Sequence, residues 1–533
     1  MSSGSAPRAI SRRELLTLIG SVAGSAVSYQ AMAGMGLVSE SNYKGPIKLE
    51  GNPKGASVLI LGAGLAGMVA AMELRNAGYK VQVLEYNNRA GGRNWSLRGG
   101  DTYTELGGFT QKCEFDPGLY LNPGPWRIPY HHHGVLDYCR RLGVALEPFV
   151  QVNYNAMVHS TQAFGGKPQR YREIQADYHG QIAELLAKVT QQKKLDELVS
   201  AEDQEILMAS LRQWGALDKH YRYVPGRDSS ERRGYEKPPA GGLSGKPVYS
   251  KDITGLSELL KSELWGSIGA GHGYEFQTTL FQPVGGMGRI GDAFKREVGD
   301  LIRYNAKVIK IHQDRKKVTV TYVDPKSGGA PQTATADYCL CTIPLSVLSQ
   351  IELNVNPKMQ AAINAVPYEA SVKVGLQFKR RFWEQDEHIY GGISYTNLPI
   401  RLIGYPNTDY HSAGKGVLLG AYVFGPNAYE FTALPPAERV RKAYEYGAMI
   451  HPQYQQEFET GIAVGWHRVP WTLGCAGAWT EASRAQHYDN LCQLDNRFLV
   501  AGEHASYIPA WQEGAILSSL DAIQRLHQHV VNR

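Results

Sequence analysis

Three glycines and one acid have the types and spacing of a phosphate-binding turn. The apolar run 57–61 ends at Gly62, and Gly64 and Gly67 follow in the pattern G-x-G-x-x-G. In a nucleotide-binding βαβ unit the first glycine makes a tight turn, the second lets the backbone approach a pyrophosphate, and the third lets the helix pack on the strand. Glu85 ends the next strand, where a carboxylate can accept hydrogen bonds from ribose hydroxyls. The pattern predicts dinucleotide binding; the alternative is a βαβ unit with a fortuitous glycine turn.

Two further glycine pairs follow the acid. Gly91 and Gly92 directly precede Arg93, and Gly107 and Gly108 come soon afterwards. Glycine pairs beside an arginine indicate backbone held close to an extended ligand, and we expect Arg93 to lie on the phosphates of that ligand. The alternative is that both pairs form solvent-facing turns.

These motifs resemble the FAD site of the flavin amine oxidase superfamily. With segments 62–67, 91–93, 283–287 and 501–503 in this order, the chain after about residue 54 resembles the L-amino acid oxidases of that superfamily. The resemblance implies FAD as cofactor and an α/β fold. This fold combines a discontinuous Rossmann-like FAD-binding domain, a mixed-sheet substrate domain and a helical insertion.

The expected organisation alternates between two domains. A twin-arginine signal-like segment (1–33) and a linker (34–54) are expected to precede them. The FAD-binding domain is expected to comprise residues 55–115, 276–350 and 489–533, and the substrate domain residues 116–170 and 351–488, with a helical insertion at 171–275. A capping box that begins at Ser200 is expected to open one helix of the insertion. The basic stretch 222–252 is expected to be a solvated loop, with a lid or access role as the alternative.

Length and composition limit the class of protein. A chain of 533 residues exceeds a single compact core, and its net charge of +6 is no argument for nucleic-acid binding. The six cysteines show neither metal-ligand spacing nor a disulfide framework, so we expect no metal site. Cys339 and Cys341 lie in an apolar run and are expected in a buried strand rather than as a redox pair.

The N-terminal segment has the composition of an export signal. Arg12 and Arg13 precede a modestly apolar stretch, which polar residues interrupt and which ends in an A-x-A-like site at Ala33. This pattern predicts Tat-type export to the periplasm or the medium, with a cytoplasmic location if the signal is not used. The polar interruptions argue against a permanent membrane anchor. The alternative is an ordinary helix capped by Ser11.

On the substrate side, the resemblance assigns three polar residues. Arg127 matches the arginine that clamps the substrate carboxylate, a task that suits the guanidinium fork. Tyr422 matches the tyrosine that donates a second hydrogen bond to that carboxylate. Lys373 is an isolated charge in an apolar strand and matches the lysine that holds a water beside flavin N5. The alternatives are a surface arginine, a core tyrosine and a strand-edge lysine.

The resemblance also assigns the walls around the substrate amine. Trp479 and Trp511 match the two aromatic positions, and Ala510 matches the small residue whose backbone carbonyl accepts a hydrogen bond from the amino group. Ala478 stands where monoamine oxidases carry the cysteine that bonds FAD covalently, so we expect non-covalent FAD. Core packing is the alternative for either tryptophan.

Three further residues are assigned to the cofactor: Val308, Gly502 and Glu503. Glu503 is expected near ribityl or phosphate-proximal groups of the flavin. The helix that begins near Gly514 is expected to direct its positive end at the flavin N1–C2=O edge, where it would stabilise the anionic reduced flavin.

Together these assignments imply oxidation of L-amino acids by O₂ to 2-oxo acids, ammonia and H₂O₂, with hydride transfer from Cα to flavin N5 as the hypothesis. A flavin amino-acid 2-monooxygenase would keep the same clamp, whereas monoamine and polyamine oxidase substrates offer Arg127 no carboxylate. A flavin-binding protein without catalysis is the non-enzymatic alternative. The family is commonly dimeric or larger, so we expect a homo-oligomer. No acidic cluster marks a preference for lysine or arginine, and broad side-chain acceptance is expected.

Overall fold

The computed structural model describes residues 41–192 and 200–532. The twin-arginine segment and the beginning of the expected linker therefore lie outside the described residues. Within the described ranges, no helix is both long enough and apolar enough to cross a membrane.

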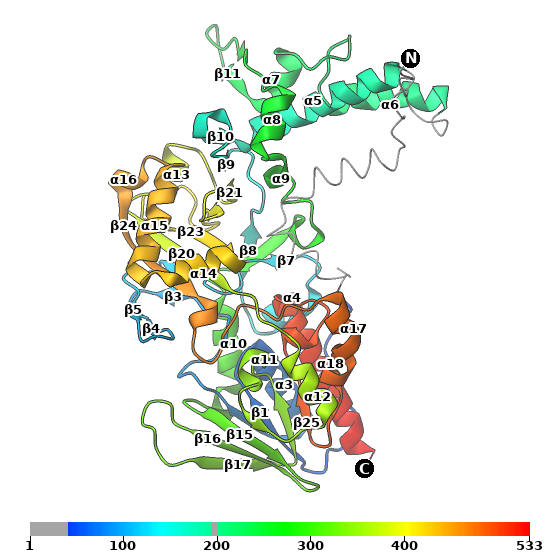
Figure 1. The fold of residues 1–533 in the computed structure, drawn as a ribbon, viewed down its shortest axis with the longest axis vertical. Helices are drawn as coiled ribbons and strands as arrows, with labels where there is room; N and C mark the ends of the chain where they lie inside the picture. Colours follow the sequence, from blue (N-terminus) through cyan, green and yellow to red (C-terminus); the bar gives the residue numbers. More distant parts are fainter. Residues whose placement is uncertain (1–40, 193–199, 533) are drawn as a thin grey trace, which may run out of the picture.

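A five-stranded parallel sheet lies in the lower half of the molecule in Figure 1. In spatial order its strands are β14 (Ile302–Arg303), β2 (Lys80–Leu84), β1 (Ser57–Leu61), β18 (Tyr338–Cys341) and β25 (Phe498–Val500). They come from three separate stretches of the chain, as an interrupted Rossmann-like domain requires. The sheet confirms the predicted fold class. Cys339 and Cys341 are fully buried in β18, as expected.

Three helices pack together beside this sheet: α3 (Leu65–Asn76), α10 (Gly288–Val298) and α18 (Gln512–Val531). Helix α3 is buried at every residue from Leu65 to Leu74, which explains why its sequence lacks a polar face. A Cβ on Gly67 would lie 2.0 Å from the Gly62 carbonyl oxygen. The helix therefore passes the turn at a distance that only glycine permits.

A seven-stranded mixed sheet forms the second half of the core. Its order is β10 (Gln169–Arg170), β9 (Met157–His159), β21 (Ile393–Thr396), β22 (Leu402–Gly404), β23 (Gly416–Phe424), β20 (Ser371–Phe378) and β24 (Phe458–Gly465). Strand β20 is buried at every position, because α14 (Gly425–Ala433) and α15 (Pro436–Ala448) also pack against it. The antiparallel register of β20 and β23 places Lys373 directly opposite Tyr422.

A small three-stranded sheet positions two loops of the site. Its strands are β7 (Ile128–Pro129), β13 (Leu280–Pro283) and β8 (Leu146–Phe149). Strand β7 directly follows Arg127, and β13 comes four residues after Phe276. Because β7 and β13 pair with each other, the loops that precede them lie close together.

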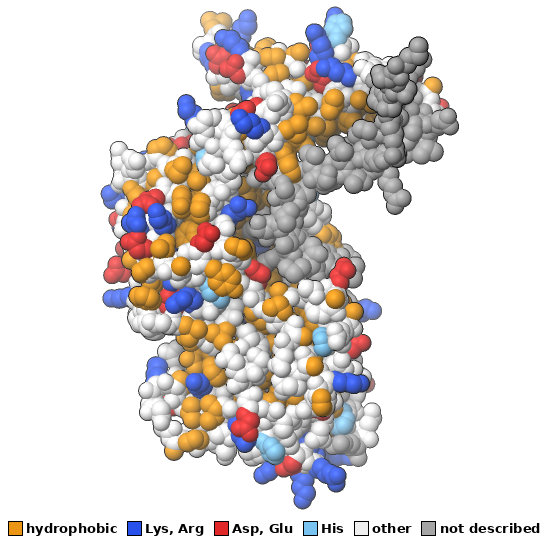
Figure 2. Space-filling model, in the orientation of Figure 1, with side chains coloured by type: hydrophobic (Ala, Val, Ile, Leu, Met, Phe, Trp, Pro, Cys, Tyr) orange, Lys and Arg blue, Asp and Glu red, His pale blue; other side chains and the backbone are white. Residues whose placement is uncertain are grey.

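The helical insertion projects as an arm from the seven-stranded mixed sheet (Figure 1). It contains α5 (Tyr171–Gln191), α6 (Ala201–Trp214), α7 (Arg227–Arg233), α8 (Leu256–Ser262) and α9 (Trp265–Ile268). The capping box at Ser200 is confirmed, since its hydroxyl accepts the Asp203 N–H at 3.0 Å. Figure 2 shows apolar side chains gathered on the arm, and exposed Ile206 and Trp214 lie on α6.

The prediction that 222–252 is a solvated loop is wrong for several of its residues. The stretch contains α7 and a hairpin formed by β11 (Tyr235–Lys237) and β12 (Val248–Tyr249). Arg233 is buried, and its Nε lies 2.9 Å from the carboxylate of the fully buried Asp177. The basic composition therefore includes a structural ion pair that holds this stretch against α5.

Candidate active site

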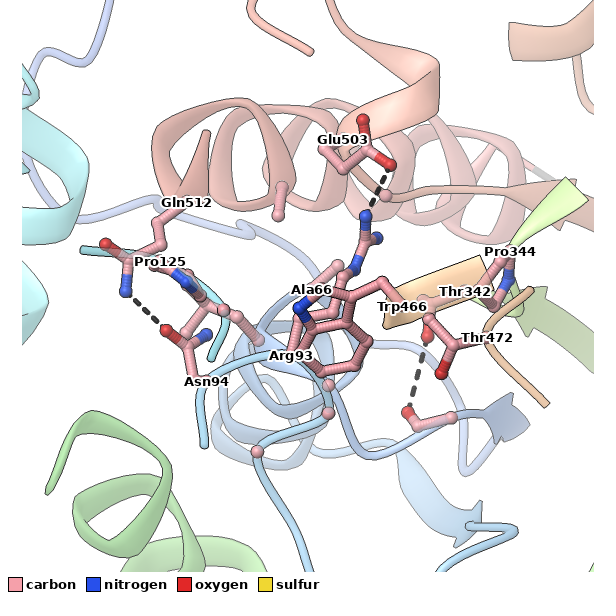
Figure 3. A pocket seen from close by; sticks show the side chains of 18 of the residues that line it. Ala66, Arg93, Asn94, Pro125, Thr342, Pro344, Trp466, Thr472, Glu503 and Gln512 are labelled. Carbon is pink, nitrogen blue, oxygen red and sulfur yellow. Dashed lines mark hydrogen bonds and ion pairs between the residues drawn. The ribbon is translucent and has the colours of Figure 1, made fainter. Parts of the chain in front are cut away.

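A long cavity runs from the glycine turn after β1 to Arg127. It encloses about 1790 Å³ between atoms, counting the portion open to solvent. Because the cavity reaches from the glycine turn to Arg127, it offers one end to a dinucleotide and the other end to a small substrate. Figure 3 shows Arg93, Trp466 and Glu503 around one region of the cavity, and Asn94, Pro125 and Gln512 around another.

The glycine turn forms an open cradle. Gly62 has φ +105°, and a Cβ there would lie 2.6 Å from Thr342 Oγ1. A Cβ on Gly64 would meet no atom within 4 Å, although Gly64 lines the cavity. A Cβ on Gly92 would lie 3.0 Å from the Gly64 Cα. The backbone thus leaves free space where a pyrophosphate must approach it, and this space fits the dinucleotide that the motif predicts.

Glu85 lines the same cavity and fastens the turn. One carboxylate oxygen accepts the Ala63 N–H at 2.6 Å, and the other accepts two hydrogen bonds from Asn87 at 2.8 Å. Its place at the end of β2 is the one that a ribose ligand requires. Contact with ribose hydroxyls stays a prediction.

Arg93 and Glu503 form an ion pair at the cavity wall. Arg93 Nη1 donates to Glu503 Oε1 at 2.9 Å and to the Cys475 carbonyl oxygen at 2.6 Å (Figure 3). Burial alone would raise the pKa of Glu503, but the Arg93 charge holds that pKa below its usual value. Gly502, with φ +138°, and Val308 in β15 (Lys307–Gln313) also line the cavity.

The structure does not place Gly107 and Gly108 in the cavity. Both lie in the turn between β4 (Thr102–Thr104) and β5 (Thr110–Lys112), exposed to solvent and outside the cavity. Their φ values of +97° and +87° show that the hairpin turn itself requires glycine. The prediction that they bind the cofactor is therefore corrected. Gly124 lines the cavity instead.

Arg127 lies at the substrate end of the cavity in aromatic surroundings. Its side chain is 6% exposed, and its Cζ lies 4.5 Å from the Phe276 ring centre and 5.8 Å from that of Trp511. Trp126 connects this group to Tyr422, since their ring centres are 6.1 Å apart. All five residues line the cavity. A buried cation in such a site is suited to hold an anionic group in a fixed orientation.

Lys373 is 1% exposed and lies behind the lining residues. Its Nζ donates to the Gly124 carbonyl oxygen at 2.6 Å and lies 4.3 Å from the Tyr422 ring centre. Burial lowers the pKa of Lys373 to about 7, and the nearby Arg127 charge acts in the same direction. Its role in holding a water stays a prediction.

Ala510 and Trp511 line the cavity just before α18. Ala510 has φ +68°, a left-handed conformation that is rare outside glycine. Its N–H donates to Glu503 Oε2 at 3.1 Å, so the ion-paired carboxylate also holds this strained turn. This hydrogen bond thereby fixes the positions of the Ala510 methyl group and the Trp511 indole relative to each other.

The structure does not place Trp479 in a substrate wall. This side chain is 1% exposed, belongs to the core and does not line the cavity. Its Nε1 donates to the His504 carbonyl oxygen at 2.8 Å. The core-packing alternative therefore describes Trp479 better, because a buried tryptophan whose N–H is satisfied needs no ligand.

Two tryptophans of the wall were not predicted from the sequence. The Trp466 Nε1 donates to the Pro123 carbonyl oxygen at 2.7 Å, and Trp471 stacks on Tyr86 with ring centres 5.1 Å apart. Both tryptophans line the cavity. Tyr86 directly follows Glu85, and this position was the signal in the sequence for an aromatic contact such as the one with Trp471. No local pattern indicated Trp466.

A buried trio beside Arg127 was not predicted either. Glu275 lines the cavity, and its Oε2 lies 2.8 Å from His132 Nε2 and 3.5 Å from His131 Nε2. The His132 ring lies 5.1 Å from that of Trp511. The consecutive histidines soon after Arg127 were the signal in the sequence, but Glu275 lies more than a hundred residues away from them.

The interrupted parallel sheet and the open glycine cradle define a dinucleotide-binding protein, and the second sheet supplies further walls of the cavity. The sequence profile described as flavin containing amine oxidoreductase matches residues 65–527, and the chain belongs to this family. Gly64, Arg93, Val308 and Glu503 are among the residues that would hold FAD.

Relatives agree with this family, and a solved structure agrees with the fold. The chain is 28% identical over 484 residues to the putative L-amino-acid oxidase YobN of Bacillus subtilis (strain 168), covering 87% of this chain and 93% of that protein. It is 28% identical over 491 residues to the L-amino-acid oxidase of Vipera ammodytes ammodytes, covering 90% and 94%. Wild-type putrescine oxidase with bound putrescine is similar in fold, with a TM-score of 0.56 at 17% identity, covering 90% of this chain and 99% of that chain.

Proposed function

We propose that this protein oxidises L-amino acids with O₂ and water, yielding the 2-oxo acid, ammonium and H₂O₂. Bound FAD supplies the redox chemistry by accepting an electron pair and passing it to O₂. The observation that carries the proposal is Arg127, a buried guanidinium at the aromatic end of the cavity.

A carboxylate is the substrate group that this end favours. The guanidinium fork binds a carboxylate bidentately, which fixes orientation as well as position. A simple amine would supply no anion to Arg127. The names of the two relatives support the same substrate class, whereas the similarity to putrescine oxidase supports only the fold.

The side chains around Arg127 prepare the substrate for oxidation. With the carboxylate held by Arg127 and Tyr422, only limited rotation of the amino acid remains, and such orientation supplies a large share of a rate enhancement. The rings of Trp126, Phe276 and Trp511 exclude water from the amine. An apolar surrounding disfavours the ammonium form, and the amine must be neutral before it is oxidised.

Peroxide release tests the proposal. The purified flavoprotein is assayed against the twenty L-amino acids, with D-enantiomers and simple amines as controls. Peroxide from L-amino acids alone supports the proposal, whereas peroxide from amines that lack a carboxylate would exclude the Arg127 clamp. Product analysis separates an oxidase, which forms a 2-oxo acid, from a 2-monooxygenase, which forms an amide and CO₂.

The flavin is proposed to be non-covalent. Ala478 has no nucleophilic atom at the position where the covalent relatives carry cysteine. Acid precipitation of the protein therefore should leave the yellow flavin in the supernatant. A yellow pellet would indicate a covalent bond from another residue.

A further inference from the structure

Glu275 places a second charge at the substrate end of the cavity. The residue is 4% exposed and lines the cavity together with its neighbour Phe276. The Phe276 ring lies 4.5 Å from the Arg127 Cζ and 6.1 Å from the Trp511 ring. A carboxylate and a guanidinium thus belong to one aromatic compartment, and neither the FAD cradle nor the carboxylate clamp uses Glu275.

The charge of Glu275 is not cancelled by a permanent cation. Among the described residues, its ion-pair partners within 4.0 Å are His132 at 2.8 Å and His131 at 3.5 Å. His132 hydrogen-bonds one carboxylate oxygen of Glu275, and a cationic ligand group in the cavity can supply a further counter-charge.

We propose that Glu275 recognises the cationic side chain of the substrate, so that the preferred substrates are L-arginine and L-lysine. This inference rests on the proposed amino-acid oxidase function. Arg127 binds the α-carboxylate, Glu275 binds the guanidinium or ammonium group, and Phe276 and Trp511 contact the methylene stem between them. A charge-selective site thereby takes the place of the broad side-chain acceptance expected from the sequence.

The three groups His131, His132 and Glu275 could also hold a metal ion, because their ligand atoms lie within 4.8 Å of one another. Recognition of a substrate cation is favoured because Glu275 lines the cavity and neither histidine does. Assays therefore contain EDTA, which keeps a divalent cation from occupying the carboxylate.

The test compares substrates of nearly equal shape and different charge. We measure kcat/KM by peroxide release for L-arginine against L-citrulline and for L-lysine against L-norleucine. The wild type is expected to prefer each cationic substrate by about 30-fold or more, the effect of one buried charge pair. Glu275→Gln should reduce both ratios to within a few-fold of one. Glu147→Gln, a carboxylate bonded to Gln282 outside the cavity, should keep the wild-type ratios.

Binding gives a readout that needs no turnover. The melting temperature of the holoenzyme is measured with 6-aminohexanoate and with hexanoate, which share a carboxylate and differ in the terminal cation. The wild type should be stabilised more by 6-aminohexanoate, and Glu275→Gln should remove that difference.

The outcomes separate the two proposals. Peroxide from L-citrulline and L-norleucine with wild-type ratios near one would overturn the role of Glu275 and leave the oxidase function standing. Substrate ratios in Glu275→Gln equal to those of the wild type would also overturn the role of Glu275 and leave the oxidase function standing. No peroxide from any L-amino acid would overturn the proposed function, and the binding comparison would then decide cation recognition. If Glu275→Gln does not fold, the wild-type ratios decide alone.

Discussion

The Arg93 guanidinium lies 2.9 Å from the Glu503 carboxylate, although 410 positions separate the two residues. Glu503 also accepts the N–H of Ala510, and Arg93 also donates to the Cys475 carbonyl oxygen. One ion pair therefore joins the glycine-rich segment after β2, the last strand of the parallel sheet and the turn before α18.

Arg93→Met tests the strength of this connection. The substitution leaves the buried Glu503 carboxylate without its counter-charge, so we expect a loss of about 3 kcal/mol in unfolding free energy and a lower flavin content. Urea unfolding and the flavin-to-protein absorbance ratio measure the two effects. The double variant with Glu503→Gln should recover some of the lost stability; equal loss in single and double variants would contradict the coupling.

Arg127→Met tests the carboxylate clamp. We expect kcat/KM for L-amino acids to fall by about 100-fold or more, because a charged hydrogen-bonding partner of the carboxylate is lost. Arg127→Lys should give an intermediate value, since lysine keeps the charge and loses the fork. Steady-state peroxide assays measure both variants. A fall of less than a few-fold in Arg127→Met would show that the carboxylate binds elsewhere.

Lys373 predicts a pH dependence of stability. Burial lowers its folded pKa to about 7, so the unfolded state binds more protons than the folded state at any pH between this value and the unfolded pKa. The contribution of Lys373 to stability should therefore rise with pH above 7, by at most about 1.4 kcal/mol per unit. Unfolding of wild type and Lys373→Met at pH 7, 8 and 9 checks this. Parallel curves for the two proteins would contradict the lowered pKa.

The backbone conformation of Ala510 predicts that few residue types are tolerated at this position before α18. Its φ of +68° suits glycine and is strained for a β-branched residue. Ala510→Gly should keep the unfolding free energy within about 1 kcal/mol of the wild type, whereas Ala510→Val should lose about 1–3 kcal/mol. Denaturant midpoints test both. Because Ala510 lines the cavity, kcat/KM should also fall in the valine variant.

Two glycine substitutions distinguish the cofactor turn from the hairpin turn. Gly67→Ala places a methyl group 2.0 Å from the Gly62 carbonyl oxygen and should abolish FAD binding. A Cβ on Gly108 meets no atom within 4 Å, so Gly108→Ala should keep full flavin content and lose only about 1 kcal/mol to its positive φ. Loss of flavin in Gly108→Ala would restore the cofactor role that the structure denies this residue.

Local spacing was sufficient to predict the glycine turn. Gly62, Gly64, Gly67 and Glu85 lie within one βαβ unit, where strand, turn and helix fix the position of each residue relative to the others. The capping box at Ser200 and the buried strand with Cys339 and Cys341 could be predicted for the same reason, because short-range backbone geometry and hydrophobicity decide them.

Only the tertiary structure decided what depends on contacts between distant segments. Gly108 has the residue type of a cofactor glycine, yet strand pairing directs its turn to solvent. Trp479 is of the residue type expected in an aromatic substrate wall, yet its side chain packs in the hydrophobic core. The pairing of β7 with β13 draws the loops of Arg127 and Glu275 into one compartment. The sequence thus determined the nucleotide turn, whose geometry is local, whereas sheet pairing and core packing decided which distant charges and rings face the substrate.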